Sequence, residues 1–93
     1  MHSHKEKVNN YKEYYELTTA QAEKALKLFT HLRRGYSSEV VNMASKKGIE
    51  ATSQEVRHVK MGYRKNPILF NMLVHLAQIE KANGVAAREK LEV

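Results

Sequence analysis

The feature that most limits the possible folds is a regular alternation of helix-start signals and glycines. The start signals are residues whose side chains cap the first turn of a helix. They are the capping-box pairs Thr18–Gln21 and Thr52–Glu55, then Ser37, and Asn66 followed by Pro67. Glycines at 35, 48, 62 and 84 close the segments that these signals open. Because glycine easily adopts the left-handed conformation that ends many helices, this punctuation divides the chain into short helices.

Apolar residues within these segments recur at the 3.6-residue period of an α-helix, so each helix has one face to bury. The stripes are Ala22, Ala25, Leu26, Phe29 and Leu32; Val40, Val41 and Ala44; Val56 and Val59; and Leu69, Met72, Leu73, Leu76 and Ile79. Helix 67–82 is the most apolar, which places it at the centre of the core or also in a dimer interface. No segment shows the alternation of a strand. We predict an all-α, compact domain of four to five helices.

Changes in composition suggest three parts of the 93-residue chain. Residues 1–17 are polar and predict an N-terminal tail or a short helix, with Val8, Tyr11 and Tyr15 on one face. Residues 18–83 are expected to form the folded domain, and residues 84–93 a C-terminal tail. In this division Arg33 and Arg34 occupy the last turn of the helix that starts at Thr18, where cations suit the helix dipole.

The composition excludes several classes of site. The chain has no cysteine, so disulfides and thiolate metal sites are absent. His2 and His4 are too few to form a structured metal site, which needs three or four converging ligands. No nucleophile motif, glycine-rich phosphate loop or HExxH pattern is present, so we expect no enzymatic activity, no cofactor and no small-molecule ligand. Without a membrane-length apolar run or a secretory signal, we expect a cytoplasmic protein without a membrane partner.

The net charge of +6 is concentrated in one part of the chain. Residues 1–16 and 66–93 each carry three cations and three acids, so the whole excess lies in residues 17–65. No acid occurs from Arg57 through Lys65. A basic segment of this kind is either a solubilising surface or the binding site of a polyanion such as nucleic acid.

Residues around the second and third predicted helices resemble a known family. They are Arg33-Arg34-Gly35-Tyr36, Glu39-Val40, Ala44, Gly48, Thr52, Val56, Val59, Gly62, Arg64, Asn66 and Pro67. Over about residues 18–80 the chain resembles a lambda-repressor-like (Cro-type) helix-turn-helix domain. The resemblance implies a central helix-turn-helix in which helix 53–61 enters the major groove of double-stranded DNA.

The turn departs from the pattern of that family. The stretch "IEAT" makes it two residues longer than the family's usual turn, which bears on the angle at which the two helices cross. When positions are counted from the cap at Thr52, Val56 and Val59 fall four and seven residues later. The second helix therefore keeps the register of the family's pattern despite the longer turn. Ala44 is expected at the close crossing of the two helices.

The resemblance and the residue chemistry together give a set of candidate DNA-binding residues: Thr52, Ser53, Gln54, Arg57, His58, Lys60, Arg64 and Lys65. Gln54 and Arg57 are the candidates for base contacts, since Gln pairs well with adenine and Arg with guanine. The cations after the helix and the amides at its start would bind phosphates. For Gln54 and Arg57 a solvated helix surface is an equally good interpretation, and His58 could face DNA or solvent.

We therefore expect a small transcriptional regulator that acts on DNA, associates with the nucleoid when bound and forms a homodimer at least on DNA. Its assignment to a phage or mobile element rests on the resemblance alone. The alternative is a non-enzymatic protein-interaction or accessory module that uses the apolar helix 67–82. Salt dependence of binding distinguishes the two, because phosphate contacts release counterions.

Overall fold

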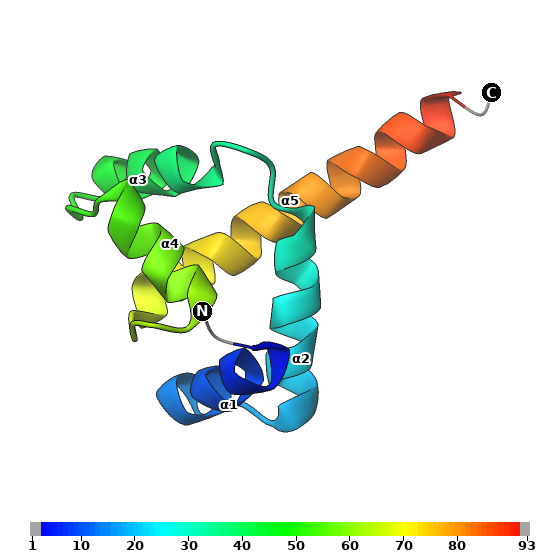
Figure 1. Cartoon of the computed structure of the whole chain (residues 1–93). Coiled ribbons are helices and arrows are strands. Elements are labelled where there is room, and N and C mark those ends of the chain that lie inside the picture. The colour runs from blue at the N-terminus through cyan, green and yellow to red at the C-terminus, as the bar shows by residue number, and fades with distance from the viewer. Residues whose placement is uncertain (1–2, 92–93) are drawn as a thin grey trace.

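The computed structural model describes the backbone of residues 3–91 and the side chains of residues 3–84. It contains five α-helices and one 3-10 turn, with no strand in the described backbone (Figure 1). The elements are α1 (His4–Tyr15), α2 (Thr19–Leu28), η1 (Phe29–His31), α3 (Tyr36–Lys46), α4 (Ser53–Met61) and α5 (Pro67–Leu91). The predicted all-α fold is confirmed. None of the described helices is long and apolar enough to span a membrane.

The N-terminal segment is a helix that belongs to the folded body. Ser3 caps α1 by accepting a hydrogen bond from the Glu6 amide, and Val8 and Tyr11 are buried. The ring of Tyr11 lies edge-on to Phe29 and Phe70, with centroid distances of 6.0 and 5.1 Å. These contacts connect α1 to η1, which carries Phe29, and to α5, which carries Phe70.

Helix α2 begins as predicted but ends earlier. Both bonds of the Thr18–Gln21 capping box form, at 3.0 and 3.1 Å. The helix stops at Leu28, a 3-10 turn follows, and Leu32 is extended. The prediction that Arg33 and Arg34 lie in the last helical turn is therefore wrong. The early end lets Leu32 pack against the core and brings Arg33 Nε within 2.5 Å of Glu80 Oε2 on α5.

Helices α3 and α4 pack on each other across the turn that contains "IEAT". The Ile49 amide donates to the Ala44 carbonyl at 2.9 Å, and Ile49 and Ala51 pack partly against the core, so the longer turn is folded back onto the body. Ala44 is fully buried. The N-cap predicted at Ser37 is wrong: α3 starts at Tyr36, Gly35 occupies the cap with φ 88°, and Ser37 is buried.

Helix α5 is the central element of the core. Asn66 Oδ1 caps it by accepting from the Leu69 amide at 3.1 Å, as predicted. Leu69, Phe70 and Leu73 are buried, whereas Ile79, predicted on the core stripe, is 42% exposed. The predicted stop at Gly84 is also wrong, because the helix continues to Leu91. Gly84 is not among the glycines with positive φ, and the end of α5 extends beyond the other helices (Figure 1).

Candidate nucleic-acid interface

Helix α4 is attached to the body along one side and at its carboxyl end. Val56 and Val59 are fully buried and anchor it to the core, as the sequence predicted. At its end the Tyr11 phenol donates a hydrogen bond to the Lys60 carbonyl, and Asn10 Nδ2 donates to the Gly62 carbonyl at 3.0 Å. These contacts fix the direction in which the remaining side chains of α4 point.

Gly62 lies at the junction between α4 and α1 in a backbone conformation that favours glycine. Its φ of 82° lies in the left-handed region, where a side chain would be strained. A Cβ at this position would also meet the Lys7 backbone at 3.6 Å and the Asn10 side chain at 3.7 Å. These are ordinary van der Waals distances, so it is the backbone conformation at the helix stop, and not a lack of space, that favours glycine here.

The side of α4 opposite its valine anchors faces solvent. Gln54 and Arg57 are exposed, and His58 is half-buried. On a helix, residues 54, 57, 58 and 61 share a face, and Val56 and Val59 lie on the other side. The arrangement leaves the two predicted base-contacting side chains free to meet a ligand.

Arg57 and Lys60 belong to a group of cations that we call the cation cluster: Lys7 of α1 with Arg57 and Lys60 of α4. Lys60 Nζ lies 4.9 Å from the centroid of the Tyr36 ring, a cation–π geometry. Burial lowers the pKa of Lys60, and the charge of Lys7 lowers it further. Burial raises the pKa of Tyr36, and the positive charge of Arg57 opposes that rise. Among the described side chains, no ion pair joins a member of the cluster to an acid.

Sequence reasoning missed two of the residues at this surface. Lys7 lies in a segment whose charges cancel, and Tyr36 was not among the candidate DNA-binding residues predicted from the sequence. Only the contact of α1 with the end of α4 brings Lys7 to Lys60, across 53 positions of sequence. The Arg34-Gly35-Tyr36 pattern at the start of α3 was the one local feature of the sequence that drew attention to Tyr36.

The other predicted residues near the start of α4 surround a second, more mixed surface. Thr52, Gln54, His58 and Arg64 line a hollow of about 330 Å³ together with Glu55. Arg64 Nη2 lies 3.3 Å from Glu55 Oε2. The Glu55 carboxylate therefore pairs with Arg64. Of the capping-box pair Thr52–Glu55, the bond from the Glu55 amide to Thr52 Oγ1 forms, at 3.1 Å.

The first two residues of the candidate set have structural roles as well. Thr52 uses its hydroxyl as the N-cap acceptor, and Ser53, the first residue of α4, is half-buried. His58 packs edge-on against Tyr63, with ring centroids 5.8 Å apart. These roles orient the start of α4 whether or not a ligand is bound.

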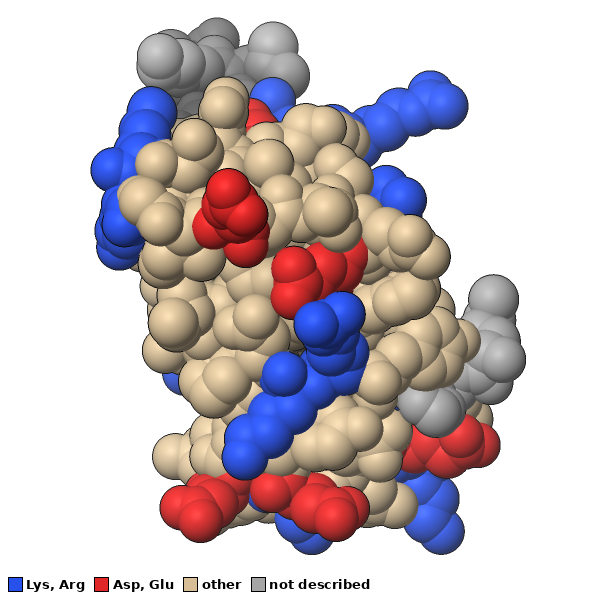
Figure 2. Space-filling model, turned by 90° about the vertical axis from the view of Figure 1, so that its left-hand side faces the viewer, with Lys and Arg blue, Asp and Glu red and all other residues tan. Residues whose placement is uncertain are grey.

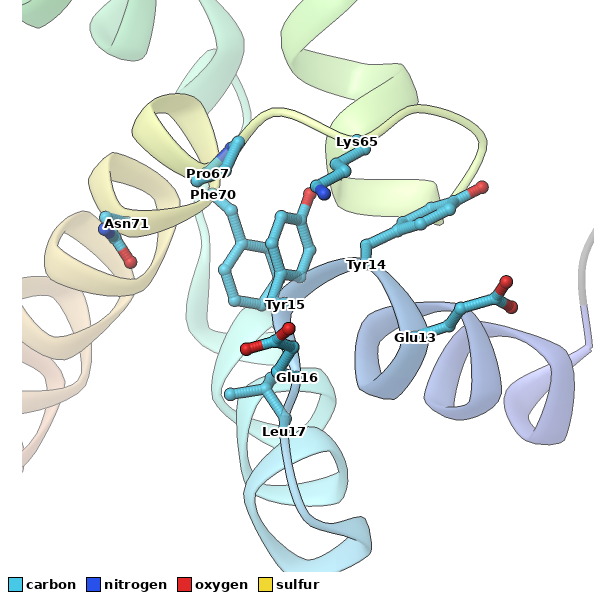
Figure 3. Close-up of a pocket in the computed structure, with 9 residues that line it drawn as sticks. All are labelled: Glu13, Tyr14, Tyr15, Glu16, Leu17, Lys65, Pro67, Phe70 and Asn71. Carbon is cyan, nitrogen blue, oxygen red and sulfur yellow. The ribbon is translucent and has the colours of Figure 1, made fainter.

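Lys65 lies in a different environment from the cation cluster. It lines a hollow of about 410 Å³ formed by the carboxyl end of α1 and the start of α5, and Glu13 and Glu16 are among the other residues that line it. Its side chain extends toward the hydroxyl end of Tyr15 (Figure 3). The structure therefore separates the predicted site residues into three neighbourhoods: the cation cluster, the Glu55 hollow and the Lys65 hollow.

The surface toward which the α3–α4 turn points carries both signs of charge. Figure 2 shows acidic and basic side chains next to one another there, within a largely uncharged surface. On this face the basic side chains are interspersed with acidic ones (Figure 2). In the described part of the chain, no group of His, Asp or Glu side chains is arranged to hold a metal ion.

Comparisons with models of known protein families, with curated proteins and with solved structures found no match.

Proposed function

We propose that this protein binds double-stranded DNA, with the exposed face of α4 in the major groove and the cation cluster on the phosphate backbone. The observation that carries the proposal is the cluster itself. Lys60 of α4 lies against the Tyr36 ring and is influenced by the charge of Lys7 of α1, and Arg57 is exposed one turn before Lys60 on α4. No described acid is paired with these three cations. The two exposed side chains suited to base edges, Gln54 and Arg57, stand on the same helix.

The electrostatics of Lys60 favour an anionic ligand. Its ammonium group is partly withdrawn from water and close to a second cation, which together lower its pKa. A phosphate placed beside Lys7 and Lys60 would offset both effects, since an opposite charge favours the protonated form. The repulsion between the cations is a cost to the free protein that binding of a polyanion removes.

The start of α4 supplies a second type of contact. The first amides of a helix lack intrahelical partners and carry partial positive charge, which suits a phosphate. Ser53 lies at this end, and Gln54 follows it on the exposed face. In this arrangement phosphates at either end of α4 would position the helix, and Gln54 and Arg57 would contact bases.

A transcriptional regulator of the phage or mobile-element type is the biological role that we propose for such a domain. It rests on the resemblance of residues 33–67 to helix-turn-helix proteins of the lambda-repressor type and on the consecutive packing of α3 and α4. A short recognition helix gives modest specificity by itself, so a two-fold dimer would increase it.

The first test is a binding titration of the full chain against a random-sequence DNA duplex at several salt concentrations. We expect the logarithm of the association constant to fall linearly with the logarithm of salt concentration, because each neutralised phosphate releases counterions. A matched set of variants, Lys7→Ala and Lys24→Ala, removes one charge each. Lys24 is exposed on α2, outside the cluster. Only Lys7→Ala should reduce the slope; the absence of any salt-dependent binding would contradict the proposed function.

A further inference from the structure

Tyr36 joins the start of α3 to the basic side of α4. The turn before it contains a hydrogen bond of 3.1 Å from the Tyr36 amide to the Arg33 carbonyl, and Gly35 with a φ of 88°, a conformation that favours glycine. The Tyr36 side chain is half-buried and packs against the core. The ring therefore has a defined place, because the turn holds its backbone and the core holds part of its side chain.

The Tyr36 side chain also lies near the two cations of α4. Lys60 Nζ is 4.9 Å from the centroid of the ring, within the range of a cation–π interaction. Burial raises the pKa of the Tyr36 hydroxyl, and the positive charge of Arg57 is close enough to oppose that rise. Arg57 and Lys60 are three positions apart on α4, so they are neighbours on its surface. One aromatic side chain of α3 thus lies beside both cations.

We propose that Tyr36 is a positioning residue, whose ring holds the Lys60 ammonium group in the place where that group binds a phosphate. This inference rests on the proposed function, because it assigns a role within the same site. A lysine side chain has many rotamers, and ordering it on binding costs free energy. Contact with the ring orders the ammonium group before the phosphate arrives. The group has three N–H donors, so donors remain for phosphate oxygens.

A neutral aromatic ring suits this role better than a carboxylate does. A carboxylate would also attract Lys60, but it would cancel the positive charge and repel the phosphate. The ring attracts a cation through its quadrupole and carries no net charge. Among the described side chains, no ion pair joins Lys60 to an acid. The charge of Lys60 is therefore positioned by Tyr36 and still available to an anion.

NMR of the free protein tests the contact between Tyr36 and Lys60 independently of the proposed function. Protons above the face of an aromatic ring resonate upfield, so the methylene next to the Lys60 ammonium group should be shifted upfield of the same methylene in the other lysines. Tyr36→Leu should remove the shift, and Tyr36→Phe should keep it. Tyr14→Leu makes the same replacement at another half-buried tyrosine and should also keep it. An unshifted Lys60 methylene in the wild type would overturn the proposal.

Titration of the full chain with a random-sequence DNA duplex at several salt concentrations tests the role in binding. Tyr36→Leu keeps every charge, so the salt slope should stay that of the wild type, while the affinity falls about two- to tenfold at each salt concentration. Lys60→Ala should instead reduce the slope by about one phosphate contact. Tyr36→Phe should bind like the wild type.

Tyr36→Met provides a second apolar replacement, and thermal melts establish which variants are folded. Wild-type affinity in a folded Tyr36→Leu or Tyr36→Met variant would overturn the proposal while leaving the proposed function intact. A wild type without salt-dependent binding would contradict the proposed function and with it the role of Tyr36 in binding, even where NMR shows the ring contact.

Discussion

The hydroxyl of Tyr11 on α1 donates a hydrogen bond to the backbone carbonyl of Lys60 on α4, which connects the first helix to the proposed DNA-binding helix. Tyr11 is fully buried. The ring of the same residue packs edge-on against Phe29 and Phe70, so one side chain joins the aromatic core to the end of α4. The orientation of Lys60 in the cation cluster consequently depends on a residue that lies outside α3 and α4.

Tyr11→Phe should remove this hydrogen bond while retaining the aromatic packing. The Lys60 carbonyl would lose its side-chain partner in a partly buried position, and we expect the free energy of unfolding to fall by about 1–2 kcal/mol. Urea unfolding followed by circular dichroism measures the change. Tyr14→Phe, a half-buried tyrosine on the same helix, is the control and should unfold close to the wild type. Equal stability of wild type and Tyr11→Phe would mean that the bond contributes nothing.

Alkaline pH provides a second test of the same contact. Burial raises the pKa of Tyr11 well above its ordinary value, with Tyr15 and Tyr36 adding to the rise. A group whose folded-state pKa is raised contributes its full stability below the unfolded-state pKa, which is about 10 for Tyr, and this stability is lost as the pH rises further. The difference in unfolding free energy between wild type and Tyr11→Phe should therefore be constant near neutral pH and shrink above about pH 10. A difference that grows with pH would contradict a raised pKa of Tyr11 in the folded protein.

Ala44 tests the packing of α3 on α4. Its side chain is fully buried next to Val40 and the longer turn, where the Ile49 amide bonds the Ala44 carbonyl. Ala44→Leu adds atoms to a filled space and should destabilise the fold by about 1–3 kcal/mol. A lower melting temperature is the expected result, and Ser45→Leu, at a neighbouring exposed position, is the control. An unchanged melting temperature for Ala44→Leu would show that the helices have room between them.

Local patterns predicted the parts of the fold that local interactions determine. Asn66–Pro67 starts α5, Gly62 ends α4, and Val56 and Val59 are buried, because capping bonds and the helical period involve residues a few positions apart. The same patterns predicted that the valines would leave the opposite face of α4 exposed. That face carries Gln54 and Arg57, as expected.

Features that depend on tertiary contacts were not predictable in this way. Arg33 leaves the helical conformation and pairs with Glu80, which is 47 positions later in the sequence. Lys7 reaches the cation cluster only because Tyr11 and Asn10 attach α1 to α4. Ile79 keeps the helical period of the core stripe yet is 42% exposed, although the side chain of the next residue, Glu80, is only 10% exposed. The exposure of Ile79 therefore depends on which side of α5 the bundle covers at this point, which the helical period alone does not give.

Lys7 and Lys65 differ in their surroundings, and this difference predicts different roles. The sequence favoured Lys65 as a phosphate contact, but Lys65 lines a hollow that also contains two acids, Glu13 and Glu16, whereas the charge of Lys7 acts on Lys60. Lys7→Ala should reduce the salt dependence of DNA binding by about one phosphate contact, and Lys65→Ala should reduce it by less. Both variants lose one charge, so each is the control for the other. A larger effect at Lys65 would favour the contact expected from the sequence.

The most direct measurement compares the affinity of wild type and Arg57→Ala for a DNA duplex selected from random sequence and for its scrambled counterpart. Arg57 is exposed on the outer face of α4, so its loss should leave the melting temperature unchanged. If Arg57 contacts a base, the variant should lose about 1–3 kcal/mol of binding free energy on the selected duplex and much less on the scrambled one. Lys24→Ala should bind both duplexes like the wild type. Equal affinity of wild type and Arg57→Ala for both duplexes, with the fold intact, would contradict the account and favour a protein-interaction role.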